Sequence, residues 1–541
     1  MDYRRRFLLM PLRMRFVVGM VFFVSWLAGM VTLFYEISIH IAAGTSDKAT
    51  TLLAGQDMGS GNILLHGWIL PPGNYWTSDV ALYALPVRLL GLHPGLLYLE
   101  PAVVAALTVV MSMLLIRELG PTCATLAGSF TVGVLLVFST PPMALWFVGN
   151  AFHILTALFT LIAFLALTRN TFGWRWAISV ALLSFGMLGD LEIVAFAMIP
   201  LALGGVSAML RRRSWRAGVA QVSAAIASAV IGELALRLTA AFGAFRRGPS
   251  LPVAHFHQMV TNLGHVFSFS AELVGLTNGR FGTAGIPIGL LGVHFVGGVL
   301  TVLGLIVALE RVVAGVVRGA PQGGTREPQQ ESWRLDDLLL FGTVGSTVLF
   351  VVLAGVNGLG IHFLSVPVLF ASILTGRMVA RAWPRLSGDM TRRTVSVIGV
   401  AVSLALASGI AVEISLPAPQ QPVSGLIAFL KKHHLHNGVG GYWAAAITTV
   451  VSRGEITVRP VEVAPNGKIR RMMTQSNDRW YHDNLFQFVV GDTLHAGNVT
   501  AIASRKTWGT PVHTYVVGQY RVYVWDRDLR ISAFPPGAKF G

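Results

Sequence analysis

Three aspartates whose side chains could do acid–base or metal chemistry fall in one polar stretch, residues 44–94. They are Asp47, Asp57 and Asp79, and the stretch lies between the first and second long apolar segments. A positioned carboxylate can take a proton from an attacking hydroxyl, and carboxylates are common ligands of divalent cations. Ordering so long a loop costs conformational entropy, which packing or binding must offset. This stretch is therefore the first candidate site in the sequence.

Asp190 and Glu192, in the sequence GDLEIVAF, form a second acidic pair where two predicted membrane spans meet. An ionisable group at membrane depth is costly, so it is a functional hypothesis by default. The topology derived below puts this pair on the same side of the membrane as Asp47. We expect a shared cavity with a general base and a metal or acceptor site. The alternative is that Asp47 and Asp190 cap helices at the water boundary.

Basic side chains near these carboxylates could hold a phosphate group by charge-assisted hydrogen bonds. The candidates are Arg237, Arg246, Arg247 and Arg280. Arg237 lies one helical turn after Glu233, so these two could simply pair with each other. The other three lie in a predicted loop, about 242–287, and could instead be solvated. His153 and His362 lie in predicted spans, where a lone histidine is either a ligand or a packing residue.

Aromatic residues in the polar segments could stack on sugar rings or belong to the aromatic belts of the membrane interface. They include Trp68, Tyr75, Trp76, Tyr442, Trp443, Trp480 and Tyr481. The chain has no HExxH, CxxC, GxGxxG or P-loop pattern. Zinc-protease chemistry and nucleotide binding at a Gly-rich loop therefore have no support.

The composition is that of an integral membrane protein. Of the 541 residues, 53% are hydrophobic and only 12% are charged, whereas soluble domains carry about 25% charged residues. The one cysteine, Cys123, excludes a disulfide framework. The formal net charge of +16 could suggest nucleic acid, but the placement of the basic residues argues for a membrane instead.

About eleven segments are long and apolar enough to cross a hydrocarbon core, which needs roughly 20 residues per helix. They are 15–40, 95–116, 121–139, 143–168, 174–190, 191–210, 217–241, 287–310, 337–357, 360–380 and 395–416. Most arginines before residue 416 fall in the connecting segments that lie on the same side of the membrane as the N-terminus. The positive-inside rule then puts the N-terminus in the cytoplasm. Residues 41–94, the loop around 242–287 and everything after 416 are expected outside the cytoplasm.

The segment after Pro417 is no longer apolar enough to span a membrane. Residues 423–434 and 441–454 have helical patterns, and 455–463, 485–490, 512–518 and 520–525 are rich in β-branched and aromatic residues. The sequence predicts a polytopic helical membrane domain over 1–416, including the loop 41–94. It predicts an extracytoplasmic α/β domain over 417–541.

Several of these motifs together resemble the GT-C glycosyltransferases, which include protein O-mannosyltransferases and bacterial aminoarabinose transferases. In that family an acidic residue just after the first span leads an amphipathic helix that ends in a small-Gly-Asp/Asn motif. Here Asp47, the segment KATTLLAGQDMG and then Ser60-Gly61-Asn62 follow that layout. GDLE at 189–192 resembles a second acidic motif of related bacterial proteins.

Two positions depart from the family pattern. Lys48 follows Asp47 where the family has glutamate, and His362, in GIHFLSVP, stands where many relatives have arginine. These departures could mean either altered specificity or lost activity.

The resemblance implies transfer of a sugar from a polyprenyl-phosphate donor to an extracytoplasmic acceptor, which would be a cell-envelope glycan, a lipid or a protein. It makes Asp47 the candidate base, with Asp57 and Asp190 as supporting or metal-binding carboxylates. The remaining candidates for substrate binding are Asp79, Glu192, Arg237, Arg246, Arg247, Arg280, His362, Trp68 and Trp76. The cofactor it implies, if any, is a divalent cation. The chain would reside in the inner or plasma membrane and would not bind nucleic acid.

Two other functions stay open on the sequence. One is a transporter or flippase for a lipid-linked or anionic substrate, and the other is a GT-C-like scaffold without catalysis. Transporters usually place charges near the bilayer midplane on broken helices of repeated halves. Here the charges gather at one rim and no matching halves are visible, which favours the enzyme over the transporter.

Overall fold

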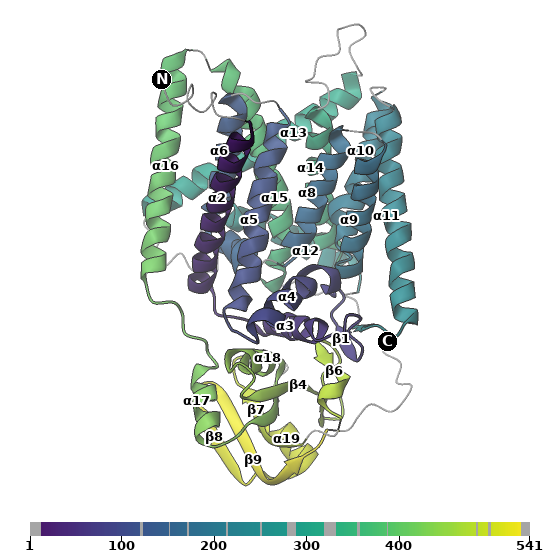
Figure 1. The fold of residues 1–541 in the computed structure, drawn as a ribbon, viewed down its shortest axis with the longest axis vertical. Helices are drawn as coiled ribbons and strands as arrows, with labels where there is room; N and C mark the ends of the chain where they lie inside the picture. The colour runs from purple at the N-terminus through teal and green to yellow at the C-terminus, as the bar shows by residue number, and fades with distance from the viewer. Residues whose placement is uncertain are drawn as a thin grey trace.

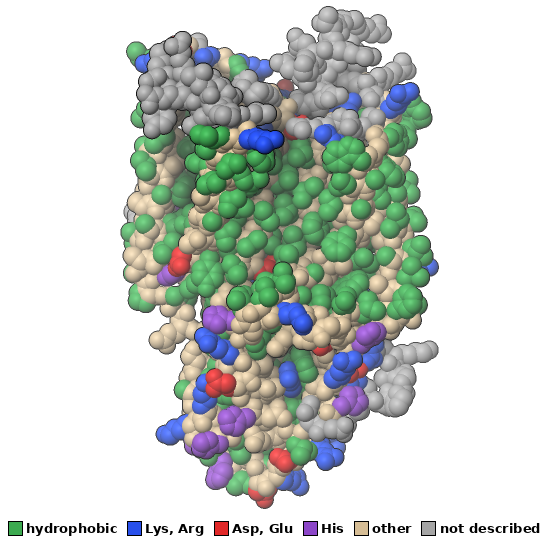
Figure 2. All heavy atoms as spheres, viewed as in Figure 1, with side chains coloured by type: hydrophobic (Ala, Val, Ile, Leu, Met, Phe, Trp, Pro, Cys, Tyr) green, Lys and Arg blue, Asp and Glu red, His purple; other side chains and the backbone are tan. Residues whose placement is uncertain are grey.

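The computed structural model describes residues 12–119, 123–150, 152–169, 172–211, 215–248, 252–277, 288–318, 332–353, 358–386, 388–482, 485–495 and 499–531. The helices that precede residue 416 form an upright bundle, and the strands and helices after it form a smaller region at one end (Figure 1). We call that end of the bundle the sheet end. Hydrophobic side chains cover the bundle, whereas charged side chains and histidines gather over the C-terminal region (Figure 2).

The bundle consists of long helices joined by short helical turns. They are α2 (Leu12–Ile41), α5 (Leu96–Arg117), α6 (Cys123–Val137), α7 (Pro141–Ala144), η2 (Leu145–Gly149), α8 (Ile154–Arg169), α9 (Trp174–Gly189), η3 (Val194–Met198), α10 (Ile199–Leu210), α11 (Trp215–Ala241), α12 (Phe256–Leu273), α13 (Ile288–Arg318), α14 (Ser332–Val352), η5 (Gly358–Leu364), α15 (Ser365–Ala382), η6 (Trp383–Arg385) and α16 (Asp389–Ser415).

The chain is a multi-pass membrane protein. Among the described residues, seven helices are long and apolar enough to span a membrane, or eight if a bent pair counts as one span. This is fewer than the eleven expected from the sequence. Three of the expected spans fall instead on shorter apolar helices, Ile154–Thr168, Trp174–Gly189 and Val194–Leu210.

The expected span over 143–168 is wrong as a single helix. Cys123–Val137 and Pro141–Gly149 are the pair that bends, by 83°, and the chain breaks again before α8. His153 adopts a left-handed backbone conformation at this second break, with φ of 65°. A histidine in that region is uncommon and marks a local constraint. The break turns the His153 side chain into the site described below.

Buried ion pairs join the bundle helices at the end opposite the sheet. Arg377 of α15 is fully buried and donates to Asp336 of α14 over 2.5 Å. Arg211, after α10, pairs with Asp337 over 3.2 Å. Removing one member of such a pair would leave an uncompensated buried charge, which costs several kcal/mol. These pairs therefore hold α10, α14 and α15 in one arrangement.

The loop between α2 and α5 forms a layer between the bundle and the C-terminal region. It contains α3 (Ser46–Gly59), strand β1 (Trp68–Leu70), the helical turn η1 (Trp76–Val80) and α4 (Ala81–Leu90). The helix predicted after Asp47 is therefore confirmed as α3. Gly55 lets α4 pack closely on it, since a Cβ there would lie 2.6 Å from the Cβ of Tyr83.

The C-terminal region is a mixed α/β structure, as the sequence predicts. Its elements are α17 (Ser424–Lys432), β3 (Asn437–Gly440), α18 (Tyr442–Val451), β4 (Thr457–Val463), β5 (Ile469–Arg471), β6 (Ser476–Asn477), η7 (Asp478–Trp480), β7 (Phe486–Asp492), α19 (Ala501–Trp508), β8 (His513–Val517) and β9 (Tyr520–Leu529). Six strands form one sheet in the order β5-β4-β3-β7-β9-β8. All four predicted strands and both predicted helices are present.

A second, three-stranded sheet ties distant segments together. β1 pairs in parallel with β2 (Arg246–Arg247), which precedes α12, and antiparallel with β6 of the C-terminal region. A single hydrophobic cluster also contains Leu52 of α3, Leu97 of α5 and Ile447 of α18. The C-terminal region is therefore packed onto the bundle through a continuous core, and α18 lies directly on α3 (Figure 1).

Candidate functional site

A cavity of about 590 Å³ lies where α3, the turn after β1, η2 and α18 meet. Its lining includes Asp47, Thr50, Asn74, Tyr75, Asn150, His362, Trp443, Gln475 and His495. These residues come from the first long loop, from the break before α8, from η5 and from the C-terminal region. The cavity therefore exists only because the C-terminal region is packed against the bundle.

Asp47 occupies the first turn of α3, where Thr45 caps the helix by accepting from the Lys48 amide. A carboxylate is favoured there by the helix dipole. Tyr442 of α18 donates its hydroxyl proton to Asp47 Oδ1, and Gln475 contacts the same hydroxyl. Burial raises the pKa of Asp47, and the hydrogen bonds from Tyr442 and Gln475 lower it only in part. A carboxylate with a raised pKa is a better proton acceptor than a solvated one.

Lys48, next to Asp47, points away from the cavity into the protein. Its side chain is buried and its ammonium group donates to the carbonyl oxygen of Gly149, at the end of η2. Burial lowers the pKa of Lys48 to about 7, while Glu100 acts in the opposite direction. A cation at a helix C-terminus satisfies a carbonyl that would otherwise be unpaired. Lys48 therefore fixes the end of η2 beside α3.

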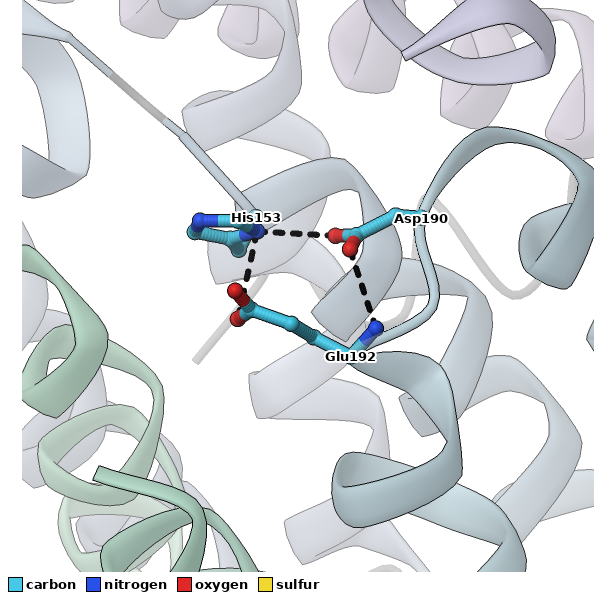
Figure 3. A group of neighbouring side chains, drawn as sticks. All are labelled: His153, Asp190 and Glu192. Atoms are coloured by element: carbon cyan, nitrogen blue, oxygen red, sulfur yellow. Dashed lines mark hydrogen bonds and ion pairs between the residues drawn. The ribbon is translucent and has the colours of Figure 1, made fainter. Parts of the chain in front are cut away.

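His153, Asp190 and Glu192 form a compact cluster at the sheet end of α8 and α9 (Figure 3). His153 Nδ1 lies 2.8 Å from Asp190 Oδ2 and 3.3 Å from Glu192 Oε2. Thr156 Oγ1 donates to Asp190 Oδ2 over 2.7 Å, and the Glu192 amide donates to Asp190 Oδ1 over 3.0 Å. One ligand atom from each of the three residues lies within 4.8 Å of the others, a spacing that could hold a metal ion.

The three groups of this cluster shift one another's protonation. Burial opposes charge on His153, but Glu192 and Asp190 outweigh burial and raise the pKa of the imidazole. Burial also raises the pKa of Glu192, although the charge on His153 acts against it. Burial alone would raise the pKa of Asp190, yet His153 and Thr156 hold it below its usual value. Asp190 and His153 therefore favour each other's charged forms, and burial favours the protonated form of Glu192 beside them.

Tyr75 and His362 stand between this cluster and the cavity that contains Asp47, because both line the cavity and both contact His153. The Tyr75 hydroxyl lies 3.5 Å from His153 Nε2, and the ring of His362 stacks on that of His153 at 5.7 Å. Gly189 allows this approach of loop and helix, since a Cβ there would lie 2.7 Å from Thr77 Oγ1. The rings of Tyr75 and His362 therefore lie between the two acidic motifs of the sequence, Asp47 on one side and Asp190 with Glu192 on the other.

Asp79 is buried close to this cluster, in η1. Burial raises the pKa of Asp79 to about 6, and the negative charge of Asp190 adds to the effect. It does not line the cavity, so the structure makes it a neighbour of the acidic cluster, not a direct contact for a ligand there.

Asp57 has a structural environment that the sequence did not reveal. Its Oδ2 accepts hydrogen bonds from Asn62 Nδ2 at 2.7 Å, Trp68 Nε1 at 2.8 Å and Asn477 Nδ2 at 3.4 Å. These partners belong to the three-stranded sheet and the turn before it. Trp68 is only 1% exposed, so its ring is core, not a sugar platform. The expectation for Trp68 is corrected, whereas the catalytic role predicted for Asp57 stays a prediction. Both residues fasten the loop to the C-terminal region.

The arginines proposed to hold phosphate lie elsewhere. Arg246 pairs with Asp478 of the C-terminal region, across the small sheet. Arg247 is an exposed residue of β2. Arg237 pairs with Glu233 over 2.8 Å on an exposed helix face, which was the alternative considered for it. None of these three lines the cavity, and Arg280 lies outside the described residues.

Trp76 also lies away from the cavity. Its Nε1 donates to the carbonyl of Ile63 over 2.8 Å, and its ring packs on Phe245 at 5.5 Å. It therefore braces the first loop against the segment before β2, and the predicted sugar contact stays a prediction.

Three residues of the site did not stand out in the sequence as partners of the carboxylates. His153 was indistinguishable from a packing residue, although the GNAFH segment around it interrupts an apolar run. Tyr442 and Gln475 lie far from Asp47 in sequence, and no local signal connects them to it. Of these three residues, only His153 has a local signal in the sequence, the GNAFH segment that interrupts the apolar run.

Comparisons with known proteins find similarity in structure only. No protein-family model matches the chain, and no curated protein matches its sequence. The crystal structure of ArnT from Cupriavidus metallidurans bound to undecaprenyl phosphate is similar at 15% identity and a TM-score of 0.50, covering 93% of this chain and 97% of that one. The oligosaccharyltransferase of Archaeoglobus fulgidus, tethered to an acceptor peptide, gives 12% identity and a TM-score of 0.43, over 86% of this chain and 69% of that one.

The same oligosaccharyltransferase in complex with Zn and sulfate gives 11% identity and a TM-score of 0.44, over 86% of this chain and 68% of that one. The similarity to ArnT, which extends over nearly the whole of both chains, confirms the resemblance at the level of fold. The chain has the same fold as ArnT.

Proposed function

We propose that this chain is a glycosyltransferase that moves a sugar from a polyprenyl-phosphate donor to an extracytoplasmic acceptor. The observation that carries the proposal is the position of Asp47. It lies in a cavity between the bundle and the C-terminal region of a GT-C fold, with its basicity set by burial and two polar neighbours. A transporter would need its charges along a path through the bundle, whereas these groups gather at the sheet end.

The class of donor follows from two considerations. The similar ArnT structure contains undecaprenyl phosphate, and a lipid-linked donor would be held in the same membrane as the bundle. Outside the cytoplasm an activated sugar cannot be drawn from a nucleotide-sugar pool, so a lipid carrier is the suitable form. This part of the proposal depends on the sheet end lying outside the cytoplasm.

We place the sheet end outside because of the positive-inside rule. The loop 41–94 and residues 417–541 then form an extracytoplasmic site on a membrane domain made by residues 1–416. The chain would reside in the inner or plasma membrane.

The chemistry needs one proton acceptor beside the acceptor hydroxyl. The hydroxyl oxygen attacks the anomeric carbon while the Asp47 carboxylate takes the hydroxyl proton. The bond between the anomeric carbon and the phosphate oxygen breaks, and its electron pair leaves with the polyprenyl phosphate. A single displacement of this kind inverts the anomeric configuration. Tyr442 holds Asp47 in place throughout, since it donates to Oδ1.

His153, Asp190 and Glu192 are a suitable donor set for a divalent cation, because they supply one imidazole and two carboxylates at close range. Such a cation would offset the negative charge that develops on a leaving phosphate. Hydrogen bonds from Thr156 and from the Glu192 amide orient the Asp190 carboxylate toward the other two groups. The cavity itself is lined by His362 but by no lysine or arginine of the described part of the chain.

The test compares two Asp→Asn variants reconstituted with a panel of polyprenyl-phosphate sugars and an envelope extract as acceptor. Release of free polyprenyl phosphate is followed by mass spectrometry. Asp47→Asn should lower release by about 10²-fold or more, because the amide keeps the shape and loses the base. Asp389→Asn is the matched control, since that carboxylate is 88% exposed at the start of α16.

Two outcomes would contradict the proposal. Full release by Asp47→Asn, with intact protein, would remove Asp47 from the mechanism. No release from any donor by the unaltered protein would favour a transporter or a scaffold without catalysis.

A further inference from the structure

Two stacked rings from the C-terminal region line the cavity on the side away from the bundle. Trp443, the second residue of α18, and His495, three residues after β7, have ring centroids 5.3 Å apart and planes inclined by 26°. Both line the cavity that contains Asp47. Neither ring is needed for the hydrogen bonds that hold Asp47.

His495 is held over Trp443 by a buried carboxylate. Asp492 is 1% exposed, and its Oδ2 accepts from His495 Nδ1 over 2.5 Å. The other carboxylate oxygen, Oδ1, accepts from the Leu494 amide at 3.0 Å and from Gln519 Nε2 at 3.2 Å. Because Nδ1 carries the proton that Asp492 accepts, Nε2 is left as the nitrogen that can accept from a ligand hydroxyl.

This side of the cavity opens to water. The His495 side chain is 44% exposed and Leu494, beside it in the cavity lining, is 71% exposed. Both follow β7 in the C-terminal region, which lies beyond the end of the bundle (Figure 1). A molecule that reaches the rings therefore arrives from the aqueous phase, whereas a lipid-linked donor would arrive from the bundle side.

We propose that Trp443 and His495 form the binding subsite for a neutral saccharide acceptor. The stacked rings offer an apolar surface for the C–H face of a pyranose, and Nε2 of the imidazole accepts from a sugar hydroxyl. The described residues that line the cavity include no lysine or arginine, so nothing there selects an acidic or phosphorylated acceptor. A peptide acceptor would not need the stacked pair.

The subsite rests on the proposed function, since it assigns the acceptor of that same reaction. Trp443 and His495 line the same cavity as Asp47, so an acceptor bound to them would have its hydroxyl in the cavity that holds the proposed base. The rings are thus specificity-determining groups and take no part in the proton transfer.

Saturation-transfer NMR on the full chain in nanodiscs tests the subsite directly. The probes are neutral oligosaccharides of glucose, of mannose and of N-acetylglucosamine. We expect at least one of them to bind the unaltered protein, and to bind about ten-fold more weakly to Trp443→Ala and to His495→Ala. Tyr515→Ala is the matched control, because Tyr515 is a half-buried ring of β8 that lies outside the cavity, and binding to it should be unchanged.

The same variants are then assayed for transfer to the bound oligosaccharide. The expected result is a rise in KM for the saccharide with little change in kcat. If Trp443→Ala fails to fold, His495→Ala still tests the subsite, because His495 lies on an exposed segment and its replacement should leave the fold intact.

The subsite would be overturned if none of the three probes bound, or if binding to both variants were undiminished. It would also be overturned by transfer to a lipid or peptide acceptor that neither substitution affects. These results differ from failure of the proposed function, which would appear as no release of polyprenyl phosphate from any donor.

Discussion

At the scale of residues, the central feature is a carboxylate whose named hydrogen-bond partners come from another region of the chain. Asp47 belongs to α3, whereas Tyr442 and Gln475 belong to the C-terminal region. Their hydrogen bonds favour the ionised form, while burial favours the protonated form. The balance between the two sets how much of Asp47 is available as a base at a given pH.

Replacing Tyr442 by phenylalanine should move the acidic limb of the pH–rate profile to higher pH. Burial already raises the pKa of Asp47, and Tyr442 is the first group that lowers it. Loss of the hydroxyl therefore raises that pKa further, so a higher pH is needed to ionise the base. Initial rates of polyprenyl phosphate release between pH 5 and 9 measure the shift. A profile that moves to lower pH, or does not move, would argue against Asp47 as the base.

At the scale of elements, the loop between α2 and α5 is fixed at three points. Lys48 binds the end of η2, Gly55 allows α4 to pack on α3, and Asp57 binds the small sheet. Asp57 differs from Asp47 in that its Oδ2 accepts from Asn62, Trp68 and Asn477 and its side chain does not line the cavity. Its side chain therefore stabilises the loop and its contact with the C-terminal region.

Asp57→Leu should destabilise this contact, because the Trp68 indole N–H would be left buried without an acceptor. Such a loss costs about 1–3 kcal/mol. We expect a lower melting temperature and faster cleavage between α16 and α17 by protease. Asp57→Asn, which keeps an acceptor oxygen, should be milder and should retain most of the transfer activity. A loss of activity in folded Asp57→Asn as large as that of Asp47→Asn would restore Asp57 as a catalytic residue.

The break between η2 and α8 is the second element that makes the site. It directs His153 toward Asp190 and Glu192, and the connection after α9 supplies both carboxylates. In a continuous helix over this segment, His153 could not adopt its left-handed conformation.

Divalent cations should stabilise the protein through this cluster. Addition of Mn²⁺ after treatment with a chelator is expected to raise the melting temperature of the unaltered chain by mass action. His153→Ala should remove most of that increase, because one of three ligands is lost. His257→Ala, at an exposed position in the first turn of α12, is the control. An equal increase in His153→Ala would show that the stabilising cation binds elsewhere.

At the scale of the whole molecule, the bundle and the C-terminal region share one core at the sheet end, and the cavity lies within that junction. The buried ion pairs of Asp336 and Asp337 fix the opposite end. Neither feature fixes the orientation in the membrane, and the distribution of basic residues predicts that the sheet end lies outside the cytoplasm.

Cysteine labelling tests that orientation. In a Cys123→Ser background, Val516→Cys should react with a membrane-impermeant maleimide in intact spheroplasts, since Val516 is 65% exposed on β8. Met390→Cys, at the start of α16 and 80% exposed, should react only after permeabilisation. The reverse pattern would place the site in the cytoplasm and exclude the proposed donor route.

Local sequence patterns were enough to predict the class of protein, the helix after Asp47, and four strands and two helices of the C-terminal region. These features depend on apolar length and on local periodicity, which neighbouring residues carry together. The sequence also pointed to both acidic motifs. It did not separate Asp47 from Asp57, because the two lie on one short helix and have the same chemistry.

Which side chains of the site contact one another depends on the tertiary structure. Tyr442 reaches Asp47 from 395 residues away, and His153 reaches Asp190 from 37 residues away. The expected span over 143–168 concealed His153, since hydropathy does not report a break between two apolar helices. Arg246 could be assigned to a phosphate or to Asp478 only once the small sheet was known. Contacts between distant segments depend on how elements pack, and no local pattern encodes that packing.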